Sequence, residues 1–131
     1  MNSYWDDELQ DWVPLATLVA ERDKLRQRLA LATEFTISVL PGDDVNHHLY
    51  EIKVVHRGAG RWAVTRFREC LGIDGSWEYE PSPSNREDDW LETHRFDLDT
   101  AMRLATDAAP GVTVNGVSAA QVAERIEASH A

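Results

Sequence analysis

The sequence contains a single cysteine, Cys70, among its 131 residues, so no disulfide can form within the chain. A chain of this kind suits a reducing compartment, and we expect a cytoplasmic protein. No run of about 18 apolar residues is present, which argues against a membrane-spanning helix. The opening residues, MNSYWDDELQ, are acidic and lack the basic start of a secretory signal peptide. These absences together predict a protein that does not associate with membranes.

Motifs of common catalytic and metal centres are also missing. No histidine or cysteine pair has the spacing of a zinc motif such as C-x-x-C or H-E-x-x-H. Gly58 and Gly60 form a G-x-G sequence that lacks the continuation and the following helix of a dinucleotide-binding loop. A Cys70–His94 nucleophilic pair is one reading, but a lone cysteine near a strand end is more often a small core residue. We therefore predict no enzymatic activity, no metal site and no cofactor.

Charge is unbalanced, with 23 acidic against 13 basic residues and a net charge of −10. A general nucleic-acid binder needs a basic surface, so we expect no direct binding to nucleic acid. The segment 53–68 holds five basic residues and no acidic one, whereas 74–99 holds nine acidic residues. An acidic surface directed at a basic protein partner is one interpretation. Internal pairing of the two signs is the alternative.

A sheet is predicted in the centre of the chain. Apolar side chains recur at every second position, or on both faces, in three consecutive segments, 49–56, 61–70 and 76–80. A period of two is typical of a strand. Glycine-containing turns at 57–60 and 74–75 connect these segments, because glycine adopts positive φ without a clash. The pattern predicts an antiparallel meander, with Trp62 or Phe67 buried, Trp77 also buried, and 35–39 as a fourth strand.

Two helices are predicted after the meander. Asp97 can cap a helix over 98–109, and Ser118 with Gln121 forms a capping box for a second helix over 118–128. Both helices place apolar residues on one side, and a short edge strand at 112–114 separates them. The predicted fold is α+β, with an antiparallel β-meander, two C-terminal helices on one face and an N-terminal helical arm.

The arm comprises residues 1–33, ahead of an α+β domain over 34–131. Residues 15–32 are rich in good helix formers and follow Pro14, which suits a first helical turn. Three leucines with a 3-4 spacing predict the seam of a homodimer, namely Leu18, Leu25 and Leu29. Packing of this helix on the sheet is the alternative.

A separate short helix is expected before Pro14, over residues 3–13. Ser3 can cap it, and the acidic residues that follow favour a first helical turn. Trp5, Leu9 and Trp12 would then share one face. We interpret them as an anchor, either onto the body of the protein or onto a partner.

The candidate partner-binding surface is the loop and sheet edge that follow residue 76. Prolines at 81 and 83 end the sheet and direct the polar loop 86–89 outward, where binding residues usually lie. Arg86 and Arg95 can pair with nearby acids and hold the loop in one shape. Trp90 is either a contact residue or a structural plug over the sheet edge. The predicted site consists of aromatic, acidic and basic residues, namely Trp77, Tyr79, Arg86, Asp88, Asp89, Trp90 and His94.

About half of the chain carries a resemblance. The features that carry it are Trp62, Cys70-Leu71, Gly75, Trp77 to Pro81, Ser84-Asn85-Arg86 and His94-Arg95-Phe96. With them, the segment 61–126 resembles small uncharacterised proteins of actinobacteria and their phages. The resemblance implies an accessory gene product, and one interpretation is that it derives from a phage. No catalytic residue can be transferred from it.

These observations predict a small, acidic, non-enzymatic accessory or regulatory protein of the cytoplasm. It would bind a protein partner with a basic surface through acidic and aromatic side chains. Mimicry of nucleic-acid charge is a variant of this hypothesis. A small-ligand or nucleotide-binding domain or enzyme is the first alternative, and a structural or virion component is the second.

Overall fold

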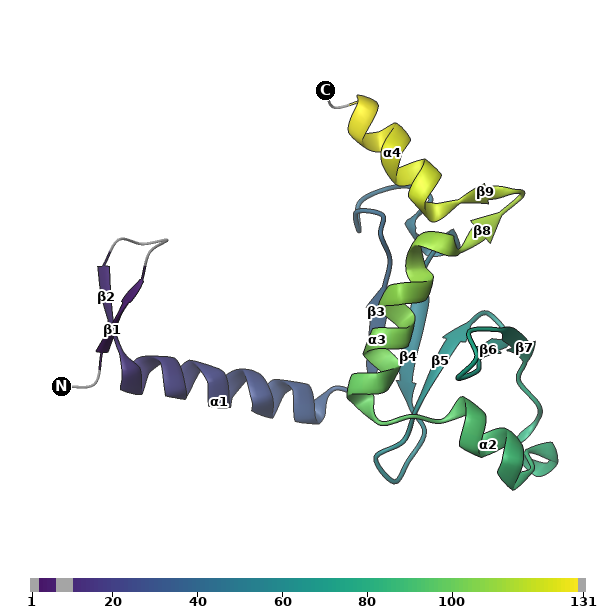
Figure 1. Ribbon diagram of the computed structural model, residues 1–131, viewed down its shortest axis with the longest axis horizontal. Coiled ribbons are helices and arrows are strands. Elements are labelled where there is room, and N and C mark those ends of the chain that lie inside the picture. Colours follow the sequence, from purple (N-terminus) through teal and green to yellow (C-terminus); the bar gives the residue numbers. More distant parts are fainter. Residues whose placement is uncertain (1–2, 7–10, 130–131) are drawn as a thin grey trace. The chain divides into compact units, whose positions relative to one another are not determined.

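A computed structural model describes residues 3–6 and 11–129 and divides the chain into two compact units, Met1–Thr33 and Glu34–Ala131. The fold is α+β, with an N-terminal helix, a five-stranded antiparallel meander and C-terminal helices that pack on the sheet, so the predicted fold class is confirmed (Figure 1). Within the described residues, no helix has both the length and the apolar character that a membrane crossing requires.

The first unit is a β-hairpin followed by a helix. Strand β1 (Ser3–Asp6) pairs antiparallel with β2 (Asp11–Pro14), and helix α1 spans Leu15–Leu31. The helix expected over 3–13 is therefore wrong, because Trp5 and Trp12 are cross-strand partners. Aromatic residues favour strands, and here that preference outweighs the helix-capping signal. Leu9, grouped with these tryptophans above, lies outside the described residues.

The second unit is built on a sheet with the strand order β3-β4-β5-β6-β7. Each strand is antiparallel to its neighbours. The strands are β3 (Glu34–Ile37), β4 (Ile52–His56), β5 (Trp62–Arg66), β6 (Glu69–Leu71) and β7 (Trp77–Tyr79). A 3-10 turn, η1 (His47–Leu49), precedes β4, so that strand begins later than expected.

One predicted strand is divided in two. The segment 61–70 turns back on itself at Phe67, whose φ is 55°, so that Arg66 pairs with Glu69. Phe67 is 73% exposed at the tip of this turn, whereas Trp62 is buried and Trp77 is half-buried. The expectation that Trp62 or Phe67 would be buried is met by Trp62 alone.

The two C-terminal helices, α3 and α4, begin close to the predicted residues. Helix α3 (Leu98–Ala108) begins where the Asp97 carboxylate accepts a hydrogen bond from Thr100 N at 2.7 Å. Helix α4 (Ala119–Ser129) begins at the capping box, with Gln121 N donating to Ser118 Oγ at 3.2 Å. Between them lie η3 (Ala109–Gly111), β8 (Thr113–Val114) and β9 (Val117–Ser118). β8 pairs with β9 in a separate hairpin and does not extend the main sheet as an edge strand.

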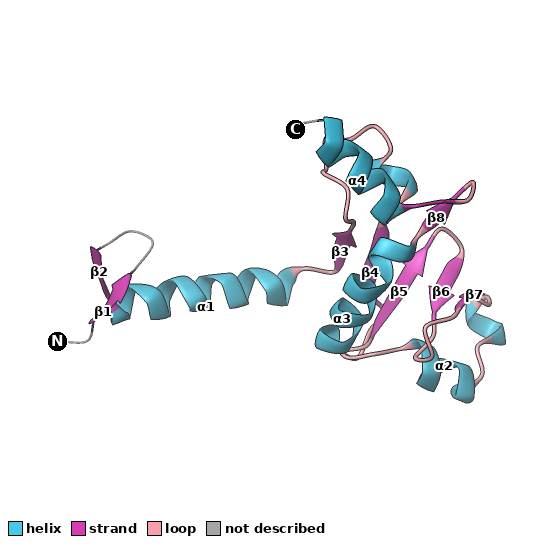
Figure 2. Ribbon diagram, turned by 45° about the horizontal axis from the view of Figure 1, so that its top comes forward, coloured by secondary structure: helices cyan, strands magenta, loops and turns pink. Residues whose placement is uncertain are grey.

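The two faces of the sheet carry different side chains. The pairing register puts Val54, Val64 and Leu71 on the face that α3 covers, where they join the apolar core (Figure 2). Ala63 and Cys70 alternate with these residues and are fully buried toward the opposite face. The chain that covers Cys70 is the end of α2 (Asp88–His94), together with Arg95. A 3-10 turn, η2 (Pro83–Asn85), leads from β7 toward this helix.

Candidate functional site

Helix α2 occupies part of the segment that was expected to be a polar loop. Asp88 and Asp89 lie in its first turn, where carboxylates interact favourably with the helix dipole, and His94 ends it. Leu91 N donates to the Glu87 carbonyl at 3.0 Å and closes the first turn. Acids in the first turn and a histidine in the last turn are the sequence signals from which this helix could have been predicted.

The Trp90 ring stacks on a side chain one turn further along the same helix. It lies parallel to the ring of His94, with centroids 4.3 Å apart and an interplanar angle of 4°. The Arg95 guanidinium also lies 5.1 Å from the Trp90 ring centroid, within cation–π range. Trp90 is half-buried, so much of its surface is already engaged within the chain. This arrangement favours the interpretation of Trp90 as a structural plug.

His94 is an internal group. It is 5% exposed, and its Nδ1 lies 2.8 Å from the Trp90 carbonyl, which can only accept. Its Nε2 has no hydrogen-bond partner among the described residues and lies 3.5 Å from a Glu78 carboxylate oxygen. Gly72 permits this approach, because a Cβ there would lie 3.2 Å from Nε2. His94 therefore supports α2 against the sheet and presents little surface to a partner.

Glu80 is the centre of an ion-pair network that the sequence did not reveal. Its carboxylate, only 14% exposed, lies 2.8 Å from Arg95, 3.3 Å from Arg57 and 3.4 Å from Arg86. Arg86 Nε also donates to the Pro81 carbonyl at 2.8 Å. Arg86 and Arg95 thus hold the segment in one shape, as expected, but they do so through Glu80 and not through the acids of α2.

The Glu80 network leaves the acids around α2 without basic partners. Four acidic residues of this helix and its start are exposed, namely Glu87, Asp88, Asp89 and Glu92. We call them the α2 acids. None forms an ion pair with a described basic residue, because the nearby arginines pair with Glu80. The result is a local excess of negative charge at the surface.

The predicted site residues are divided between the two faces of the sheet. Arg86, Asp88, Asp89, Trp90 and His94 gather at α2. Trp77 and Tyr79 pair with Leu71 and Glu69 and therefore point toward the α3 side, while Glu78 between them points toward His94. Tyr79 is 66% exposed, and Trp77 lines a pocket of about 280 Å³ with Arg66 and Val112.

An exposed apolar residue beside α2 was not among the predicted site residues. Ile73 is 52% exposed, and its backbone N donates to the Thr93 carbonyl at 2.9 Å. This bond places Ile73 next to the end of α2, beside the residue that follows Glu92. The neighbouring Asp74 is held by Ser76, whose N–H and hydroxyl lower the pKa of the Asp74 carboxyl.

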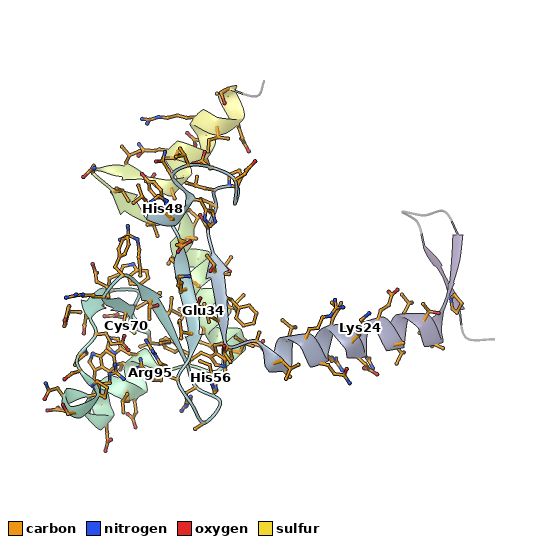
Figure 3. All side chains as sticks on the ribbon, turned by 180° about the vertical axis from the view of Figure 1, so that it is seen from behind. Lys24, Glu34, His48, His56, Cys70 and Arg95 are labelled. Atoms are coloured by element: carbon orange, nitrogen blue, oxygen red, sulfur yellow. The ribbon has the colours of Figure 1, made fainter. Side chains whose placement is uncertain are left out.

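Cys70 has the environment of a core residue. Burial raises the pKa of its thiol, which keeps it protonated at neutral pH. Its sulfur contacts the His94 carbonyl at 3.9 Å and the Arg95 guanidinium at 3.7 Å (Figure 3). Across residues 3–6 and 11–129, no three histidine, cysteine or acidic side chains are grouped so as to hold a metal ion.

The predicted dimer residues lie along α1. Leu25 and Leu29 are 57% and 51% exposed, Leu18 is half-buried, and no residue of α1 is buried. An isolated helix of 17 residues is marginally stable in water, so a leucine stripe of this kind favours association. The homodimer seam stays a prediction.

Comparison with known proteins provides no relative for this chain. No family model, no curated protein and no solved structure matches it. The function proposed below therefore depends on the chemistry of the described residues.

Proposed function

We propose that this chain is a non-enzymatic accessory or regulatory protein of the cytoplasm that binds a protein partner with a basic surface. The observation that carries the proposal is the group of α2 acids, which are exposed and form no ion pair within residues 3–6 and 11–129, while nearby arginines pair with Glu80. Neighbouring carboxylates repel one another, and a basic partner relieves this repulsion. Such a charged patch also attracts the partner over a distance and raises the association rate.

The apolar part of the proposed interface is Ile73, beside the end of α2. Protein interfaces combine apolar anchors with a charged rim, and an exposed Ile73 at the end of an acidic helix has this composition. Trp90 adds the part of its ring that the stack with His94 leaves uncovered. Tyr79, on the α3 side of β7, would lie at the margin of such an interface.

The support beneath α2 favours binding without rearrangement. The Glu80 ion pairs and the Trp90–His94 stack fix the helix before a partner arrives. A surface that is ordered in advance loses less conformational entropy on association. A rigid acidic helix on a sheet is therefore a suitable recognition element.

The experiment compares two variants of equal charge in affinity purification from host cells. Asp88→Asn with Glu92→Gln removes two α2 acids, and Glu124→Gln with Glu127→Gln removes two exposed acids of α4. We expect one stoichiometric partner to be retained by the wild type and the α4 variant and lost from the α2 variant. Equal retention by both variants would refute the proposed surface.

A partner that itself binds nucleic acid would favour the charge-mimicry variant of the proposal. In that case, added nucleic acid should displace this protein from its partner. A partner that stays bound in the presence of nucleic acid would exclude mimicry and leave the acidic interface in place.

A further inference from the structure

A pocket of about 580 Å³ lies between the β4–β5 hairpin and α2. The hairpin wall contains Arg57, Gly58, Ala59 and Arg61, and Arg95 also lines the pocket. The opposite wall contains Asp88 and Glu92 of α2. The pocket therefore has a basic side and an acidic side.

The basic side has hydrogen-bond donors to spare. Arg95 is buried and bound to Glu80 and to the His94 carbonyl, so it provides a fixed charge. Arg57 makes one ion pair with Glu80, and Arg61 makes no side-chain hydrogen bond or ion pair with another described residue. Since each guanidinium carries five N–H donors, Arg57 and Arg61 can bind an additional oxyanion.

The loop between these arginines contributes backbone donors. Gly58, Ala59 and Gly60 are all in the left-handed region, with φ of 91°, 52° and 69°. Arg61 N donates to the Gly58 carbonyl, but the three loop N–H groups donate to no other described residue. Alanine rarely adopts this conformation, and consecutive free N–H groups in such loops are suited to anions. Unlike a dinucleotide-binding loop, this loop is not followed by a helix, but its backbone N–H groups can still bind an anion.

The acidic side selects against a simple anion. A free oxyanion bound at the arginines would be repelled by Asp88 and Glu92 across the pocket. A ligand with an ammonium group on that side would be attracted by the same carboxylates. The two walls together thus fit a molecule that carries both charges.

We propose that this pocket binds a small zwitterion in which a phosphate ester or carboxylate is linked to an amine. Arg57, Arg61 and the loop N–H groups hold the oxyanion, and Asp88 with Glu92 hold the ammonium group. The site goes beyond partner binding and does not depend on it. Arg61 makes no contact with the α2 acids within ion-pair distance, so its substitution separates the two functions.

The experiment titrates the full chain with O-phosphoethanolamine and β-alanine, as the phosphate and carboxylate forms, by calorimetry. Arg61→Gln, which breaks no described contact, should weaken binding by about tenfold, the effect of losing one charge-assisted hydrogen bond. Arg26→Gln on α1 is the control of equal charge and should bind as the wild type does. Absence of saturable binding of both probes at millimolar concentration, or equal affinity of the Arg61→Gln variant, would overturn the proposal.

The acidic wall is tested with Glu92→Gln and two probes that each carry charge of a single sign. Inorganic phosphate should bind the wild type more weakly than O-phosphoethanolamine does, and ethanolamine should not bind measurably. Glu92→Gln should strengthen phosphate binding and reduce the preference for O-phosphoethanolamine by about tenfold. An unchanged preference in this variant would overturn the zwitterion assignment.

Discussion

The two faces of the main sheet are stabilised by different forces. On the α3 side, apolar side chains such as Ile52, Val54 and Val64 are fully buried against Ala101 and Ala105. On the α2 side, the sheet is covered by charged and aromatic groups. They make ion pairs to Glu80, the Trp90–His94 stack, and the contact of the Arg95 guanidinium with the Cys70 thiol. Apolar packing is not weakened by ionic screening, whereas charged contacts can be adjusted by solvent and ligands. The α2 side is therefore the side suited to recognition.

The largest effect is expected on the apolar face. Ile52→Ala removes a fully buried side chain and should lower the free energy of unfolding by about 2–5 kcal/mol, because a cavity remains. Urea unfolding followed by tryptophan fluorescence measures this loss, which should be the same at low and high salt. Val45→Ala, at an exposed loop position, is the control and should leave the unfolding midpoint unchanged.

A smaller effect is expected at the centre of the charged face. Glu80→Gln leaves three arginines without their carboxylate and should cost about 1–3 kcal/mol of unfolding free energy. The difference from the wild type should shrink as salt increases, since ions screen the lost attraction. Glu69→Gln, an exposed acid on β6, is the control. A salt-independent loss would show that the network acts through packing.

Trp90 tests whether the charged face contributes to both stability and binding. Trp90→Ala removes the stack on His94 and should lower the unfolding free energy by about 1–2 kcal/mol. It should also weaken partner binding by roughly 2 kcal/mol. Trp90→Phe keeps a ring for stacking and should recover much of the stability. Full stability of the alanine variant would exclude the structural-plug interpretation.

The acids of α2 should affect association kinetics more than folding, because only their interaction with the helix dipole contributes to stability. Asp88→Asn with Asp89→Asn should slow partner association several-fold at low salt and much less at high salt. Stopped-flow or biosensor rates measure the effect. An unchanged association rate at low salt, in a variant that remains folded, would place the partner surface elsewhere.

Helix α1 belongs to the first unit and lies outside the comparison of the two sheet faces. Leu25→Asp introduces a charge in the leucine stripe and should convert a dimer to a species near the 14.8 kDa chain mass in light scattering. Gln27→Asp, on another side of the helix, should leave the mass unchanged. The unfolding of the α+β unit should be the same in both variants. A wild-type protein that is already monomeric at micromolar concentration would exclude the dimer.

Local signals in the sequence predicted the starts of α3 and α4 and the glycine turns of the sheet, but they missed α2 and the turn at Phe67. Asp97 and the Ser118–Gln121 capping box both mark helix starts because their side chains bond to backbone groups three residues away. Phe67 gave no such signal, since a bulky residue at positive φ is rare and apolar alternation continues through it. The turn forms because pairing of β5 with β6 outweighs this local strain.

The candidate site was only partly predictable, because some of its contacts follow from local patterns and others depend on tertiary packing. Alternation in β7 already separates Trp77 and Tyr79 from Glu78, so their division between faces follows from strand periodicity. The Glu80 network does not follow from strand periodicity. Arg57 lies 23 residues from Glu80 in the sequence, and only the folded sheet brings the two side chains together. Contacts of this range depend on tertiary packing, and no local pattern encodes them.

The single cysteine makes the charged face experimentally observable. Cys70 has no exposed surface, and it lies beneath Arg95 and the end of α2. An alkylating reagent can reach the thiol only when this covering opens, so the labelling rate reports the population of the open form. Because no other cysteine competes in the chain, the mass increment of one label reports on Cys70 alone. The protein thus carries its own chemical probe for the fluctuations of α2, which a bound partner or ligand should suppress.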